Sequence, residues 1–104
     1  MIGTVVGYRS TPYDFEKNDK KVKGVSYKMS LTCDYPLDKE REITGDGEMC
    51  DIFKCPKVMI DSVQVGDVVS VDVDYPDGVG TVGRIKSAML QVDVDGKFYF
   101  LPIF

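Results

Sequence analysis

Aromatic and basic side chains alternate between residues 8 and 28, and their types suit contact with a charged, planar ligand. This segment holds four aromatic and six basic residues against three acidic ones, which gives it a net charge of +3. Single-stranded nucleic acid needs cations for its phosphates and aromatic faces for its bases, and stacking contributes roughly 1–3 kcal/mol per base. The sequence therefore predicts a nucleic-acid-binding surface made of Tyr8, Arg9, Tyr13, Phe15, Lys17, Lys20, Lys21, Lys23, Tyr27 and Lys28.

Each part of this segment also has a purely structural explanation. Lysines in a loop often serve solubility alone. Tyr27 shares the alternating face of Met29 and Leu31, which favours a place in the core. Tyr13 and Phe15 stand in polar sequence, so they are either exposed to a ligand or folded over one end of the domain. The sequence leaves these alternatives open.

The remainder of the chain is acidic. It has seven basic and fourteen acidic residues, a net charge of −7, and residues 61–80 contain five aspartates and no basic residue. We expect one pole of the molecule to attract phosphate and the other to repel it. An alternative function is a small β-barrel protein-interaction module, in which this acidic face or the apolar C-terminal tail meets a protein partner. A third alternative is a β-barrel enzyme or nuclease accessory that uses the aspartates with a divalent metal.

Catalytic chemistry has little support in the residue inventory. The chain has no histidine, which removes Ser-His-Asp and Cys-His catalysis and most catalytic zinc sites. Cys33, Cys50 and Cys55 are an odd number of thiols and too few for a structural zinc site. Residues 78–83 match the pattern G-x-G-x-x-G, but they lead into β-rich sequence rather than a helix. We therefore expect no enzymatic activity, no metal and no cofactor.

Length and composition predict one globular domain. The chain has 104 residues, of which 43% are apolar, and this is enough to build a core. It has no run of eighteen apolar residues, and its first residues lack the features of a signal peptide. We expect a cytoplasmic protein with reduced cysteines and no membrane segment.

Apolar residues recur mostly with a period of two, which predicts strands. Pro56 suits the first turn of a short helix over residues 56–62, and Asp95-Gly96 suits the two-residue turn of a hairpin over residues 92–100. The segment 10–23 is polar and is expected to be a long loop or the tip of a projecting hairpin. Strands are expected at residues 2–9, 27–35, 48–54, 69–75 and 79–86, with a short one at 42–44.

This order of elements predicts an all-β fold, a small five-stranded OB-like barrel with one short helix and an extra C-terminal β-hairpin. The barrel is expected to span residues 1–88 and the hairpin and tail residues 89–104 of a single domain. An SH3-like barrel is the structural alternative.

Residues 23–35 resemble the second-strand region of the filamentous-phage gene V type single-stranded DNA-binding proteins, where a Gly/Lys loop leads into a strand with a tyrosine and a cysteine. The chain is also similar to small proteins of Gram-positive phages and mobile elements. The matching stretches are Gly7-Tyr8-Arg9, a Lys-rich loop, a cysteine-containing strand at residues 50–53 and Val-Gly-Asp-Val-Val-Ser-Val at residues 65–71.

The resemblance implies an OB-type fold, homodimers and cooperative coating of single strands without sequence preference. By position it implies Tyr27 as a stacking residue and Lys23, Lys28 and Arg9 as phosphate contacts. We therefore expect a non-sequence-specific single-stranded DNA-binding protein that takes part in the DNA replication of a phage or mobile element. The sequence does not separate DNA from RNA as the ligand.

The C-terminal tail is strongly apolar, with Phe98, Phe100, Ile103 and Phe104 among the last seven residues. Chain ends fray unless they dock, and large exposed apolar patches are rare in monomers. We therefore expect the segment Phe98–Phe104 to form the interface of a homodimer.

Overall fold

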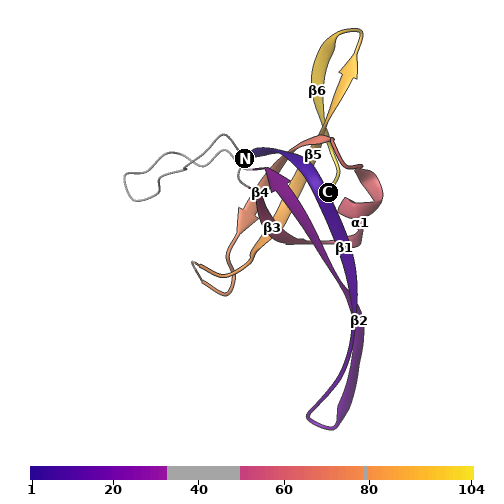
Figure 1. The fold of residues 1–104 in the computed structure, drawn as a ribbon, viewed down its shortest axis with the longest axis vertical. Coiled ribbons are helices and arrows are strands. Elements are labelled where there is room, and N and C mark those ends of the chain that lie inside the picture. The colour runs from indigo at the N-terminus through magenta and orange to yellow at the C-terminus, as the bar shows by residue number, and fades with distance from the viewer. Residues whose placement is uncertain (33–49, 79) are drawn as a thin grey trace.

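The computed structural model describes residues 1–32, 50–78 and 80–104 (Figure 1). These residues form one short helix and six strands. The elements are β1 (Ile2–Lys17), β2 (Lys20–Thr32), β3 (Cys50–Cys55), α1 (Lys57–Ser62), β4 (Val68–Asp74), β5 (Gly83–Val94) and β6 (Lys97–Pro102).

The sheet closes on itself. Its strand order is β3-β2-β1-β4-β5-β6, and an additional pairing of β3 with β5 joins five of the strands into a ring. This closing pair is parallel and short, with Phe53 opposite Gly83 and Lys54 opposite Arg84, while the other pairs are antiparallel. α1 lies between β3 and β4 in the chain, and β6 is paired to β5 outside the ring. The predicted all-β, barrel-like fold with one short helix and an extra C-terminal hairpin is confirmed.

The core fills the inside of this ring. Met29, Leu31 and Phe53 are almost completely buried, as the alternation in β2 and β3 predicts. Met59 of α1 is also buried, so the short helix covers part of the core. Pro56 stands at the N-cap of α1, one residue before the helix begins. The remaining buried residues are Val5, Cys55, Val63, Val69, Val71, Ile85 and Ala88.

A β-bulge in β1 decides which side chains face the core. The register of β1 against β2 shifts between Val5 and Gly7, so that Val5 lies opposite Leu31 while Tyr8 lies opposite Met29. An extra residue in one strand reverses the alternation that follows it. From Gly7 onwards, the odd-numbered residues of β1 therefore point away from the core.

The segment 10–23 is not a loop. β1 and β2 continue past the barrel as a two-stranded arm, and Lys17 lies opposite Lys20 at its end. The connection is a two-residue turn in which Asn18 and Asp19 have φ angles of 53° and 60°, values that Asn and Asp tolerate better than other side chains. The hairpin prediction is confirmed and the loop prediction is wrong. Figure 1 shows this β1–β2 arm, residues 10–27, projecting from one end of the ring and the β5–β6 hairpin from the other.

One other expectation differs from the structure in detail. β5 begins at Gly83, and residues 80–82 of the predicted strand belong to the turns before it, where Gly80 has a positive φ angle; residue 79 lies outside the described residues. β5 continues from the barrel into the hairpin as one strand. Residues 33–35, 42–44 and 48–49 of the expected strands lie outside the described residues. In the part of the chain that is described, no helix has the length and apolarity to cross a membrane.

Close contact between β1 and the end of β2 requires a glycine at position 3. A Cβ atom added to Gly3 would collide with the backbone carbonyl oxygen of Thr32. We expect Gly3→Ala to lower the free energy of unfolding by about 1–3 kcal/mol, because the backbone must shift. Gly7→Ala is the matched control, since its added Cβ would meet no atom within 4 Å. Urea unfolding checks this prediction, and equal stabilities of the two variants would contradict it.

Two cysteines of the described residues differ in their surroundings. Burial raises the pKa of the Cys55 thiol from 9.0 to about 11, whereas Cys50 is exposed. Because the thiolate is the reactive form, we expect iodoacetamide at mildly alkaline pH to modify Cys50 and to spare Cys55 in the folded protein. Tryptic cleavage after Lys54 places the two thiols in separate peptides for mass spectrometry, and equal labelling would contradict the prediction.

The raised pKa of Cys55 also makes the free energy of unfolding depend on pH. The unfolded chain ionises Cys55 near its ordinary value of 9.0, while the folded protein keeps the thiol protonated up to about 11. The free energy of unfolding is therefore expected to fall as the pH rises through this range.

Candidate nucleic-acid interface

The strand register divides the ten candidate residues between two faces of the β1–β2 arm and the sheet that continues from it. We call the side that points away from the core the outer face and the opposite side the inner face. The outer face carries Arg9, Tyr13, Phe15, Lys17, Lys20 and Lys28, and the inner face carries Tyr8, Lys21, Lys23 and Tyr27.

A row of three cations crosses the outer face. Arg9 of β1 lies opposite Lys28 of β2, and Lys28 lies opposite Lys54 of β3. Neighbouring strands are about 4.8 Å apart, so the three side chains leave the sheet side by side. Lys54 forms an ion pair with Asp77 at 3.9 Å. Among the described residues, no carboxylate is within ion-pair distance of Arg9 or Lys28. These two charges are therefore available to a ligand.

Lys54 was not among the sequence candidates. Its position in the row depends on the register of β3 against β2, which pairs residues 26 positions apart in the chain. The only local indication that Lys54 faces outwards is its position between Phe53 and Cys55, which are both buried.

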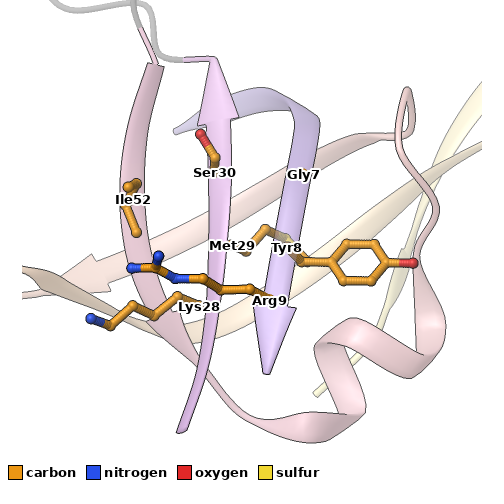
Figure 2. Close-up of a pocket in the computed structure, with 7 residues that line it drawn as sticks. All are labelled: Gly7, Tyr8, Arg9, Lys28, Met29, Ser30 and Ile52. Atoms are coloured by element: carbon orange, nitrogen blue, oxygen red, sulfur yellow. The ribbon is translucent and has the colours of Figure 1, made fainter. Parts of the chain in front are cut away.

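A shallow pocket of about 190 Å³ lies beside this row. Figure 2 shows the side chains of Arg9 and Lys28 extending in the same direction across β2, while the Tyr8 ring points the other way. The space at Gly7 is open, since an added Cβ atom there would meet nothing within 4 Å. The lining residues are Gly7, Tyr8, Arg9, Lys28, Met29, Ser30 and Ile52. The pocket thus combines a largely apolar floor with two cations at its edge.

Tyr13 and Phe15 form an exposed aromatic pair farther along the same outer face. Their ring centroids are 5.8 Å apart with an angle of 37° between the planes, and the residues are 41% and 49% exposed. The Tyr13 ring lies over Gly24 of β2, where an added Cβ would collide with the ring. Tyr13 is four residues from Arg9, about 13 Å along an extended strand. Neither ring covers the end of the barrel, so the structural alternative for these residues is wrong.

The end of the arm concentrates positive charge. Lys17 and Lys20 lie directly opposite one another beside the Asn18-Asp19 turn. Like charges at opposite positions of an antiparallel pair destabilise it. A bound anion would relieve this repulsion, which makes the tip suitable for a phosphate.

The four candidates on the inner face have other partners. Lys23 forms an ion pair with Asp14 at 3.8 Å, and Lys21 lies opposite Glu16. Tyr27 is partly buried and packs against the core, so the structural alternative applies to much of its ring. The structure therefore does not bring these residues together with the outer-face cations. Of the contacts that the gene V resemblance implies, Arg9 and Lys28 are on the outer face and Lys23 and Tyr27 are not.

The aspartates of residues 61–80 are partly neutralised. Arg84 donates two hydrogen bonds to Asp74, at 3.1 and 2.8 Å, and this contact raises the pKa of Arg84. Asp72 accepts a hydrogen bond from the Ser87 hydroxyl at 2.9 Å, and Asp77 pairs with Lys54. Within the described residues, no three Cys, Asp or Glu side chains are grouped closely enough to hold a metal ion.

Searches of protein-family models, of curated proteins and of solved structures found no match to this chain. The resemblance to the gene V type proteins thus remains a prediction from the sequence motifs.

Proposed function

We propose that the outer face of β1, β2 and β3 binds single-stranded DNA without sequence preference. One observation supports this proposal. The Arg9–Lys28–Lys54 row and the exposed Tyr13–Phe15 pair lie on the same face of the sheet. A single nucleic-acid strand that lies on this face can therefore contact cations through its phosphates and aromatic rings through its bases. A duplex keeps its bases stacked inside, so it would gain only the phosphate contacts.

The chemistry of such binding is phosphate neutralisation together with stacking. Every base has an aromatic face, so two exposed rings would accept any sequence. Neither contact uses the 2′-hydroxyl group, and RNA is expected to bind as well as DNA. Phosphate contacts by Arg9 and Lys28 would together contribute about −1.4 to the slope of a log–log plot of affinity against salt.

Fluorescence anisotropy with a labelled oligo-dT tests the proposal. Affinity should fall with added salt, and unlabelled oligo-dT should displace the label far better than a duplex of equal length. Binding that is equal for single strand and duplex, or no binding at low salt, would contradict it.

A protein-interaction role for the acidic segment is less well supported. Three of its five aspartates already have a partner within the chain, namely Asp72, Asp74 and Asp77. The apolar β5–β6 hairpin is the stronger protein-binding feature.

A further inference from the structure

The β5–β6 hairpin leaves apolar side chains in water on both of its faces. Leu90 is the last residue of β5 that pairs with β4, so the hairpin extends beyond the barrel without a second neighbour. Leu90 and Ile103 still pack against the core. Beyond them the exposed residues are Val94, Phe98, Tyr99, Phe100 and Leu101, at 37–66% of their full accessible area.

β6 is also an open sheet edge among the described strands, because it pairs only with β5. Ile103 donates its N–H to the carbonyl of Ala88, so the alternating residues Leu101, Tyr99 and Lys97 direct their backbone groups towards β5. The N–H and C=O groups of Phe98 and Phe100 therefore point to the free edge. Exposed, apolar edges of this kind are templates for pairing with another strand.

We infer that β6 pairs antiparallel with β6 of a second copy of this chain, across a two-fold axis at Tyr99. In this register Phe98 exchanges backbone hydrogen bonds with Phe100 of the partner subunit, and Tyr99 lies opposite Tyr99 of the partner subunit. Aromatic residues then face aromatic residues at all three positions, which is a favourable cross-strand combination. Lys97 lies opposite Leu101 of the partner subunit, so no like charges meet.

The other two-fold registers lose hydrogen bonds. Centring the pair on Phe100 would place Phe98 opposite Pro102 of the partner subunit, which has no N–H to donate. Centring it on Phe98 would require Gly96 in the ladder, but Gly96 belongs to the turn and has a φ of 79°. A parallel pair in register would set Lys97 against Lys97. The strand is self-complementary in one antiparallel register.

The exposed rings lie on both faces of β6, with Phe98 and Phe100 on one face and Tyr99 on the other, at 66%, 37% and 49% exposure. Edge pairing continues both faces across the two-fold axis, so that each ring gains an aromatic neighbour from the second copy. Asp93 and Asp95 near the turn would repel the phosphates of a nucleic acid or an anionic membrane, which favours a protein as the occupant.

Cysteine cross-linking tests the register. Opposite residues at a non-hydrogen-bonded position are about 4.5 Å apart at Cα, within disulfide range. In a full-length Cys33→Ser, Cys50→Ser background, Tyr99→Cys should give a covalent dimer under copper-phenanthroline oxidation. Leu101→Cys is the matched control, because its own copy would be about 13 Å away along the strand. Equal cross-linking of both variants, or none of Tyr99→Cys, would overturn the inference.

Sedimentation equilibrium tests the edge pairing independently of cysteine chemistry. The native chain should be a dimer. Phe100→Pro removes an N–H that points away from β5, a position where an edge strand tolerates proline, so the variant should be a folded monomer. Phe100→Ala keeps the N–H and should remain a weaker dimer. A monomeric native chain, or a dimer of undiminished affinity in a folded Phe100→Pro variant, would refute the pairing. Neither experiment depends on nucleic-acid binding.

Discussion

The double variant Arg9→Gln, Lys28→Gln is expected to bind oligo-dT about tenfold more weakly at low salt, with a salt slope about 1.4 units shallower than that of the native protein. Both side chains lie at the edge of the outer-face pocket and lack a carboxylate partner among the described residues. Glutamine keeps most of the side-chain length and hydrogen bonding but removes the charge. Anisotropy titrations at several salt concentrations measure both quantities.

Lys21→Gln, Lys23→Gln is the matched control. It removes the same amount of charge, from β2 alone, and these lysines lie on the inner face opposite Glu16 and Asp14. We expect a smaller loss of affinity and a nearly unchanged salt slope. If the two double variants lose affinity equally, then binding responds only to net charge and the outer face has no special role.

Tyr13→Ala, Phe15→Ala is expected to weaken single-strand binding by about 5- to 150-fold for each base that loses its stacking partner, corresponding to roughly 1–3 kcal/mol. The salt slope should stay close to the native value, because no cation is removed. Both rings are exposed on the arm, away from the core, so the thermal midpoint should change little. Gly24→Ala should produce part of the same loss, because its methyl group displaces the Tyr13 ring.

Tyr8→Ala is the control for ring removal. Tyr8 is in the same strand and is exposed to a similar degree, but its ring points away from Arg9 and Lys28 (Figure 2). Its loss should leave affinity largely intact. A larger loss for Tyr8→Ala than for the Tyr13, Phe15 pair would place the stacking surface on the inner face.

Features with local sequence signals were predictable. Met29 and Leu31 follow the period of two that marks a half-buried strand, Pro56 marks the start of the helix, and Asp95-Gly96 marks a hairpin turn. Each signal depends on neighbouring residues alone. The order of these elements was enough to indicate a small all-β, barrel-like fold.

Features that depend on non-local pairing were not predictable. The bulge after Val5 changes which residues of β1 face outwards, and only the register against β2 reveals it. The same holds for Lys54, which joins the cation row through the pairing of β2 with β3. The β1–β2 arm has no core behind it, so polar residues occupy both of its faces and the alternation that marks a strand is absent there. Composition therefore singled out this segment but could not divide its residues between two faces.

Photo-cross-linking of the native protein to an oligonucleotide containing bromodeoxyuridine tests the central claim most directly, because it shows which side chains touch the bases. Trypsin separates the two aromatic hairpins, since Arg9 and Lys17 bound a peptide with Tyr13 and Phe15, while Lys97 precedes a peptide with Phe98, Tyr99 and Phe100. We expect the cross-linked bases on the peptide of residues 10–17. Cross-links confined to residues 98–104, or to the inner-face Tyr27, would contradict binding at the outer face.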